Sequence, residues 1–435
     1  MTTPASRLTR VVAAGLVAAF TSCLPAAAQP APVLPLADAV QLALAQNRDL
    51  QQAQAEVDKA TYQSDLARAQ RLPRINLGII QPNFISEVDL RLGPVNLGLP
   101  RAFAFAFGTV TQPISQLYDI GLGMKAAALG QSAAGERLRG ARQAVVNELT
   151  RGYYACVRAQ TGLVVAREAV ALSREIERML QTLVDERVAL DADLLEAQAR
   201  LAKQEHDVLV LENALVTGRE RINVALGRAP DTAFSFDTIP ASVPADVEVA
   251  TARDRMLDQR PDIRQARLAV QLADVDIRAK KAERLPRVGA LFTYAGNINM
   301  SLLPGNMSAA VLQASWEPWD WGRRSREVAV KSLTAKQADT AVRQLEASAV
   351  VDLAAKARSL REARSLVTVS ELGERAARER LRVVLDRNTE GAVLAKDLLQ
   401  AQVGLADAVF NYQAALLAYW DARADYEKVA GDDPR

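Results

Sequence analysis

Apolar and small residues alternate in two separate parts of the chain. In the first part, Phe103, Phe105 and Phe107 alternate with alanine and glycine, and in the second part a similar alternation runs through Leu312. Successive side chains of a β-strand point to opposite faces, so this pattern predicts strands within about 75–112 and 288–317. Gly-Pro and Pro-Gly-Asn turn signals lie inside these stretches, and each stretch is therefore expected to form a hairpin.

Long helical segments flank the two predicted hairpins. Residues 36–70 and 247–283 precede them, and two proline-free stretches of about 65 residues, 122–187 and 323–387, follow them. At about 1.5 Å of rise per residue, each later stretch would form a helix of roughly 100 Å. Each long helix ends at a short turn, near 188–193 or 391–397, and a further helix follows.

Prolines and glycines mark the boundaries between these elements. The sequence RLPR occurs at 71–74 and again at 284–287. Its proline lacks an N–H group and disfavours helical geometry in the preceding residue, so the helix should end there. The expected helix–strand and strand–helix junctions are Pro73, Pro113 and Gly121 in the first half and Pro286, Pro318 and Gly322 in the second.

The chain contains an internal repeat. Residues 49–74 align with 262–287 with 10 identities in 26 positions, and residues 193–227 align with 397–431 with 10 in 35. Self-similarity of this length indicates two copies of one structural unit. We expect a first unit over 29–231, a linker over 232–245 and a second unit over 246–435. Each unit consists of a helix, a β-hairpin, a long helix and a further helix.

The first 28 residues read as a secretory signal peptide. Two arginines precede an apolar run, and Ala26-Ala27-Ala28 forms a small-residue cleavage site. Lipidation of Cys23 stays an alternative to ordinary cleavage, because small residues precede this cysteine. No later run of 18 apolar residues follows, so we expect no membrane-spanning helix in the mature chain. The protein is therefore expected to act outside the cytoplasm.

Four strands with bulky residues on one face suit a membrane barrel, in which those residues contact lipid. The expected lipid-facing residues are Phe103, Phe105, Phe107, Leu312 and Trp316. Closed membrane barrels have at least about eight strands, because an open sheet edge leaves hydrogen-bonding groups unsatisfied in lipid. Four strands in one chain consequently require partner chains, and we expect a homo-oligomer.

Composition excludes several other classes of protein. The 53 basic and 51 acidic residues nearly balance, and nothing indicates binding to nucleic acid. A single histidine and the absence of phosphate-binding, dinucleotide-binding, metal-ligand and nucleophile motifs argue against an enzyme. We expect no cofactor, no metal site and no catalytic residues. A periplasmic coiled-coil scaffold or adaptor, soluble or lipid-anchored, is the alternative function, although such a protein has no need of two strand pairs.

The order and duplication of these motifs resemble the TolC family of outer-membrane efflux proteins. LPLADAVQLALAQNRDLQQAQAEV (34–57) resembles the opening helix of that family, and RLPR resembles its helix-to-strand junction. QPISQLYDIG and WEPWDWG resemble its strand-to-helix returns. The segments ALDADLLEAQARL and GAVLAKDLLQAQVGL resemble its helical hairpin tips. The resemblance covers nearly the whole mature chain.

The resemblance implies a mainly α-helical protein with a membrane β-barrel part. Three chains would form a 12-stranded barrel in the outer membrane and a coiled-coil tunnel that extends into the periplasm. Such a protein is the exit duct of a tripartite efflux or type I secretion system and conducts its cargo passively. The implied partners are a periplasmic adaptor, an inner-membrane pump and outer-membrane lipid.

The resemblance also implies roles for residues near the helical tips. Adaptor contacts are expected at Val188 and Leu190 in the first unit and at Gly391 and Leu394 in the second. The first tip has Arg187 where the second has the glycine typical of the family, so the two docking sites are expected to differ.

A periplasmic aperture is expected beside these tips. Asp193 and Asp397 match aspartates of the family's aperture, whereas Val393, Asn388 and Gln400 replace its arginine, its tyrosine and a further aspartate. An ion-paired latch is therefore not expected, and three copies of Asp397 would form an anionic ring that attracts cations. Alternatively, Asp397 caps its helix, a position that aspartate favours.

Overall fold

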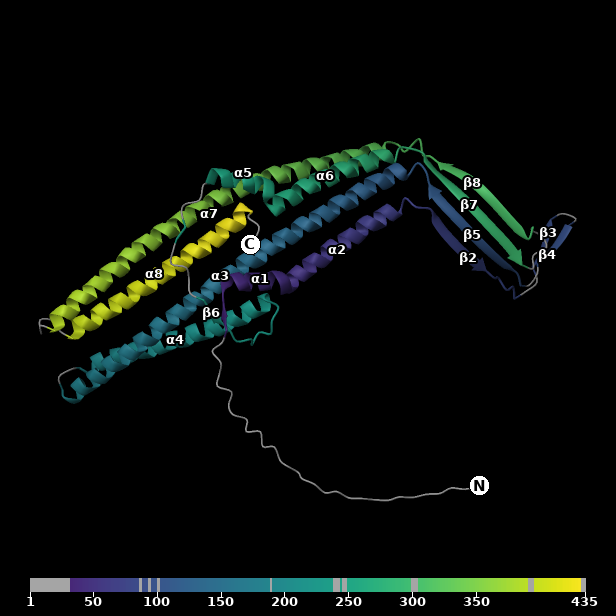
Figure 1. The fold of residues 1–435 in the computed structure, drawn as a ribbon. Coiled ribbons are helices and arrows are strands. Elements are labelled where there is room, and N and C mark those ends of the chain that lie inside the picture. Colours follow the sequence, from purple (N-terminus) through teal and green to yellow (C-terminus); the bar gives the residue numbers. More distant parts are fainter. Residues whose placement is uncertain are drawn as a thin grey trace, which may run out of the picture.

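The computed structural model describes residues 32–85, 88–92, 95–99, 102–187, 190–237, 243–244, 249–298, 304–389 and 395–431. The molecule is elongated, with a β-sheet at one end and the ends of two helical hairpins at the other (Figure 1). No helix in these ranges is both long enough and apolar enough to cross a membrane. Cys23 and the predicted signal peptide lie outside the described residues.

The first unit contains a short strand, helices on both sides of a sheet segment, and a small outer hairpin. Its elements are β1 (Val33–Leu34), α1 (Leu36–Gln46), α2 (Arg48–Ala69), β2 (Arg74–Ile80), β3 (Val88–Leu92), β4 (Val95–Leu99), β5 (Ala104–Pro113), α3 (Leu117–Asp185), α4 (Asp191–Ala225) and β6 (Ser235–Phe236). β6 pairs in parallel with β1 and so returns the chain to the start of the unit.

The second unit repeats this plan without the outer hairpin in the described residues. Its elements are α5 (Val249–Gln259), α6 (Pro261–Ala282), β7 (Arg287–Ile298), β8 (Asn306–Ser315), α7 (Arg323–Thr389) and α8 (Ala395–Ala430). The expected duplication of helix, hairpin, long helix and helix is confirmed, whereas the predicted domain boundaries remain predictions.

Strands and helices form one continuous layer. The four-stranded sheet has the order β2-β5-β7-β8, and every neighbouring pair is antiparallel. These strands connect directly to α2, α3, α6 and α7, which lie side by side in the same order (Figure 1). Toward the hairpin ends, α4 and α8 replace α2 and α6, so α3 and α7 run through both halves of the helical region.

Each of the two helices expected before a hairpin is broken in two. Asn47 separates α1 from α2, and its Oδ1 accepts hydrogen bonds from the backbone N–H groups of Asp49 and Leu50 at 2.9 and 3.1 Å. Such an N-cap satisfies donors that the first helical turn leaves free. Arg260 separates α5 from α6, and Pro261 then occupies the first turn of α6, a position that proline tolerates.

The two breaks contact the ends of the last helices of their units. Gly227, just after α4, has a φ of 72° and lies against the backbone of Gln46. Gly431, just after α8, has a φ of 78° and lies against Arg260. A side chain at either glycine would meet that backbone, and a positive φ disfavours other residues. The two glycines thus occupy equivalent positions, here called the joints, where the end of the last helix of each unit meets the break in its first helix.

The helical cores lie around these joints. One buried cluster contains residues of α1, α3, α4 and β6, and a second contains residues of α5, α6, α7 and α8. Cys156 of α3 is buried and faces Gly218 of α4, where any larger side chain would collide with its sulfur. Close approach of two helix backbones explains the glycine, and burial raises the pKa of the Cys156 thiol to about 11. Cys156 is therefore a structural rather than a reactive cysteine.

One boundary prediction is wrong, and one hairpin was not predicted. Gly121 lies within α3, which already begins at Leu117, so it does not separate strand from helix. A glycine is accommodated there because a few residues of good helical propensity outweigh its cost of about 1 kcal/mol. The β3–β4 hairpin was also not expected, although VDLRL and VNLGL alternate on either side of Gly93-Pro94.

The other junction residues lie where the pattern placed them, at the ends of their elements. Pro73 and Pro286 directly precede β2 and β7, and Pro113 ends β5. Pro318 lies between β8 and α7, and Gly322 has a φ of 80° just before α7.

Candidate functional site: the two sheet faces and the strand–helix junctions

The pairing register defines which side chains share a face of the sheet. Residues directly opposite each other in antiparallel strands point to the same side. Leu77 pairs with Gly108, Gly108 with Tyr294, and Tyr294 with Ser308, so these four residues share one face. We call it the apolar face, because its large exposed side chains are Ile75, Leu77, Ile79, Phe292, Tyr294, Ile298 and Leu312.

The opposite face, here called the mixed face, carries more polar side chains. Asn76 pairs with Thr109, and Thr109 with Thr293, whereas Gly78 pairs with Phe107 and Ile80 with Phe105. The only charged residues in the four strands, Arg74 and Arg287, also belong to this face and lie at its helical end. The two faces therefore differ in chemistry over most of their height.

The prediction that the five expected lipid-facing residues share one face of the sheet is wrong. Phe105 and Phe107 lie on the mixed face and Leu312 lies on the apolar face, so they cannot contact the same environment. Phe103 precedes β5 and is only 8% exposed. Trp316 follows β8 and is well exposed, and its indole Nε1–H donates to the carbonyl oxygen of Arg284 at 3.2 Å. Alternation within one strand could not reveal which face carries the exposed apolar residues of its neighbours.

The phenylalanines form a cluster of their own at the end of the sheet far from the helices. The ring of Phe103 lies 5.8 Å from that of Phe84 and 5.3 Å from that of Phe105, the latter edge to face. Phe107 lies over Gly78 of β2, where any side chain would collide with the ring. Glycine at that position thus provides the space for Phe107.

A hydroxyl group joins the two units where the sheet meets the helices. Ser115, between β5 and α3, donates through Oγ to the carbonyl oxygen of Pro286 at 2.8 Å and accepts from the Val288 N–H at 2.7 Å. The N–H groups of Ile114 and Ser115 both donate to the Val288 carbonyl oxygen. Together these contacts fix the return of the first unit to the RLPR junction of the second.

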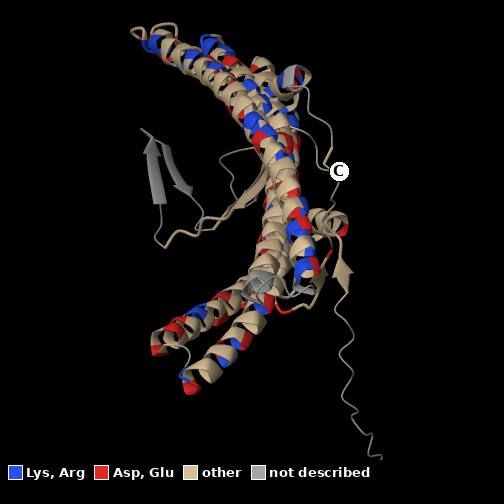
Figure 2. Cartoon of the chain, turned by 90° about the vertical axis from the view of Figure 1, so that its left-hand side faces the viewer, with Lys and Arg blue, Asp and Glu red and all other residues tan. Residues whose placement is uncertain are grey.

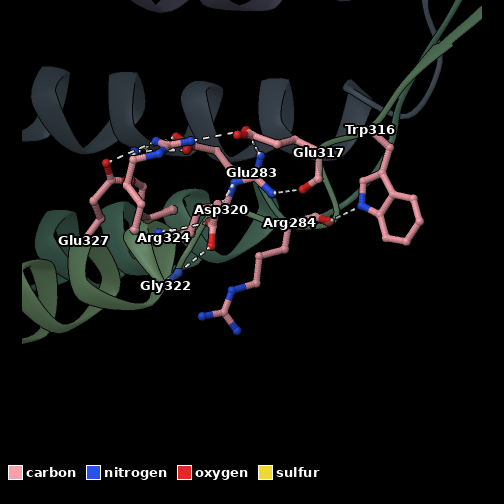
Figure 3. A network of polar contacts seen from close by, with 10 residues as sticks. Glu283, Arg284, Trp316, Glu317, Asp320, Gly322, Arg324 and Glu327 are labelled. Carbon is pink, nitrogen blue, oxygen red and sulfur yellow. Dashed lines mark hydrogen bonds and ion pairs between the residues drawn. The ribbon is translucent and has the colours of Figure 1, made fainter.

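A polar network surrounds the start of α7 (Figure 3). Asp320 accepts hydrogen bonds from the N–H groups of Gly322 and Arg324 at 3.0 and 3.1 Å, and these bonds lower the pKa of its carboxyl group. Glu317 binds Arg324 at 2.6 Å, and Glu327 binds Lys280 of α6 at 3.0 Å. The side chains of Arg324 and Asp320 are only 12% and 16% exposed, so the network orients α7 where it leaves the sheet.

The predicted tip residues are described only in part. Val188, Gly391, Val393 and Leu394 lie outside the described residues, and the side chains of Asn388 and Asp397 are likewise not described. Leu190 is 69% exposed and directly precedes α4, while Asp193 in the first turn of α4 and Gln400 in α8 are exposed. Arg187 has a φ of 60°, a conformation that favours glycine, which agrees with Gly391 at the matching position.

Polar side chains also connect the two units between α3 and α8. Arg158 pairs with Asp421 at 3.2 Å, and Asp425 accepts from Asn147 of α3 at 3.3 Å and from Lys356 of α7 at 2.7 Å. Asn147 is buried, so this contact crosses the core. The sequence did not predict this row of contacts, and its only signal is the pair of aspartates four residues apart in WDARADY.

The two aspartates respond differently to burial. Burial raises the pKa of Asp421 to about 6, although the guanidinium groups of Arg158 and Arg151 act in the opposite direction. Burial would also raise the pKa of Asp425, but hydrogen bonds from Lys356 and Asn147 outweigh it and leave that pKa lowered. In this row, therefore, the cost of burying a carboxylate is offset at Asp425 but only partly at Asp421.

Comparison with known proteins identifies the family. The sequence pattern of the family described as outer membrane efflux protein matches residues 39–228 and 252–432. The chain belongs to this family, and the resemblance to the TolC family is confirmed. Outer membrane protein OprJ of Pseudomonas aeruginosa is 28% identical over 326 residues, which is 71% of this chain. The match spans 64% of OprJ, less than two thirds of its length.

Solved structures share the fold. The outer-membrane channel OprN superposes with a TM-score of 0.76 at 20% identity and covers 91% of this chain and 89% of its own. The CmeC outer membrane channel of Campylobacter jejuni gives a TM-score of 0.77 at 15% identity and covers 91% and 85%. These likenesses confirm the expected fold class over nearly the whole described chain.

We predict that Asp421→Asn removes a pH dependence of stability. An ordinary aspartate has a pKa of about 3.9, so the raised pKa means that the folded protein binds more protons between about pH 4 and pH 6. Stability should therefore fall as the pH rises through this window, and less so in the variant. Thermal unfolding in detergent, followed by circular dichroism from pH 4.5 to 7.5, measures the effect. The exposed Asp407 of the same helix provides the control variant, and parallel curves for Asp421→Asn and wild type would contradict the prediction.

Proposed function

We propose that the protein is the outer-membrane exit channel of a tripartite efflux or secretion system and conducts cargo passively from the periplasm to the outside. The observation that carries this proposal is the four-stranded sheet. It has an apolar exposed face, and among the described residues its outer strands, β2 and β8, each pair with a neighbour on one side only. Family membership supports the same function. The channel uses no cofactor and no catalytic residues, and it binds no nucleic acid.

The sheet supports a closed assembly of three chains. Pairing of β8 in one chain with β2 of the next would join three sheets of four strands into a barrel of 12 strands. Closure removes every open edge, which is the condition for strands to span a bilayer. In this barrel the apolar face contacts lipid and the mixed face lines the lumen, and the helices continue the wall into the periplasm.

An arginine substitution in β2 tests the proposed barrel. Leu77→Arg on the apolar face should cost about 2–4 kcal/mol of barrel stability near the bilayer midplane, whereas Asn76→Arg on the mixed face should cost little. The measured quantity is the temperature at which trimers dissociate in mild detergent. Equal losses for both variants would contradict the assignment of faces, and monomers at all temperatures in the wild type would contradict the channel itself.

The helical tips are the proposed contact sites for a periplasmic adaptor, through which the channel meets an inner-membrane pump. Two tips per chain give six in the trimer, which suits a ring of six adaptors. The exposed Leu190 and the left-handed Arg187 support an accessible first tip that differs from the second, where Gly391 and Leu394 occupy the matching positions.

Site-specific crosslinking tests these contacts. Cysteine at Leu190 or at Leu394 should crosslink to an adaptor expressed with the channel, with different yields at the two tips. Cys156 is buried and adds no background. Cysteine at Ile85, which is fully exposed at the sheet end, serves as control. Crosslinks from Ile85 and none from either tip would refute the proposal.

The aperture is proposed to close near Asp397. Val393, Asn388 and Gln400 supply no ion-paired latch, and three Asp397 carboxylates would repel one another and attract cations. Asp397→Asn should therefore weaken block of single-channel currents by divalent or trivalent cations, and Asp193→Asn should weaken it less. Recordings in planar bilayers provide the measurement. Unchanged block in Asp397→Asn would mean that this residue, which lies in the first turn of α8, does not line the aperture.

A further inference from the structure

The phenylalanine cluster at the outer end of the sheet has no role in the proposed barrel wall. A barrel stabilised by lipid contact needs its large apolar side chains on the apolar face, but Phe105 and Phe107 point to the mixed face. Phe84 and Phe103 join them through ring contacts. Four phenylalanines, close to half of the nine in the chain, thus gather on the side that the proposed function assigns to the lumen.

Packing against neighbouring residues fixes the positions of the phenylalanine rings in the sheet. Phe103 is almost buried by its neighbours, and its ring meets Phe105 edge to face at 5.3 Å, a favourable geometry for aromatic pairs. Phe107 pairs with Gly78 on one side and with Ala295 on the other, so small residues flank it. The result is a partly exposed aromatic surface that is held in place by the buried ring of Phe103.

The described strand residues that pair with Phe105 and Phe107 are uncharged, and in Figure 2 the charged residues lie mostly on the helices. The strand residues next to Phe105 and Phe107 on the mixed face include Asn297, Ala295 and Thr109. The charged residues of this face, Arg74 and Arg287, lie at the helical end. Arg74 pairs with Thr111, six residues from Phe105, and is therefore roughly 20 Å away along the strand. Within β2, β5, β7 and β8, the only cations of the mixed face are therefore distant from the aromatic rings.

The diameter of the barrel brings the rings within reach of cargo. Barrels of about 8 strands are filled by their own side chains, whereas porins of about 16–18 strands enclose a wide aqueous channel. Three sheets of four strands give 12, so the lumen is of intermediate width. Three copies of the cluster would form an aromatic ring around it at one height.

We propose that this phenylalanine cluster binds aromatic organic cations as they pass through the outer part of the channel. The proposal rests on the proposed channel function, which places the mixed face in the lumen. Aromatic rings attract cations through their faces and stack with aromatic groups, so a cation that carries aromatic rings satisfies both preferences. An aliphatic cation of equal charge makes the first contact without the stacking.

Current block by two phosphonium ions tests the proposal. Tetraphenylphosphonium and tetrabutylphosphonium carry the same charge, and only the former has aromatic rings. In planar bilayers, tetraphenylphosphonium should block wild-type currents at lower concentrations than tetrabutylphosphonium. The double substitution Phe105→Ala with Phe107→Ala should raise the blocking concentration of tetraphenylphosphonium about tenfold, as expected when two aromatic contacts are lost, and change that of tetrabutylphosphonium much less.

Two further variants separate the site from general effects. Phe105→Leu with Phe107→Leu keeps apolar volume and should lose most of the preference for the aromatic ion. Ile79→Ala removes a side chain beside the cluster, but from the apolar face, and should leave block unchanged. Equal block by both ions in the wild type, or equal effects of the Phe105/Phe107 and Ile79 substitutions, would overturn the proposal. A wild-type protein that forms no channels would instead overturn the proposed function.

Discussion

A single-layer sheet that is unfinished on its own is the constraint on which the rest of the structure depends. The strands β2 and β8 each have a neighbour on one side, and the apolar face exposes Leu77 to 83% and Ile79 to 76%. Unpaired N–H and C=O groups would be costly in lipid, and such apolar exposure would be unfavourable in water. In the proposed assembly, closure with other chains pairs the open edges, and contact with lipid covers the apolar face. The helical region suits this assembly, because each strand continues directly into a helix and the helices keep the order of the strands.

The helices solve a different problem, which is how to keep one layer of four elements over a great length. The long α3 and α7 run through both halves of the helical region. Between the sheet and the joints their neighbours are α2 and α6, and between the joints and the tips their neighbours are α4 and α8. Polar contacts between units, such as Ser115 with Pro286 and Arg158 with Asp421, fix the order of neighbours along this wall. The buried clusters stay small, because a core forms between packed layers of secondary structure and this chain has one layer over most of its length.

The sequence predicts the repeated plan well, because that plan depends on local signals. The proline in RLPR ends a helix through its effect on the local backbone. Likewise, the alternation of apolar and small residues within one segment is enough to predict a strand there. The facing of Phe105 and Phe107 could not be predicted in this way, since it depends on how β2 and β8 complete each face of the sheet. The break at Asn47 was missed for a related reason. Its amide caps α2 and also donates to the carbonyl oxygen of Ala225, a partner 178 residues away.

The glycines at the two joints give the molecule a mechanical property. Gly227 and Gly431 fix the last helices of the two units against the breaks at Asn47 and Arg260. From there each helix extends to a tip and packs along its long neighbour, α4 on α3 and α8 on α7. The 35 residues of α4 make an arm of roughly 50 Å. A tilt of about 6° at the joint would carry the far end of such an arm through about 5 Å, a distance comparable to one helical turn. A helical hairpin that pivots as one body at such a joint would therefore amplify a small adjustment there into a much larger displacement of its tip.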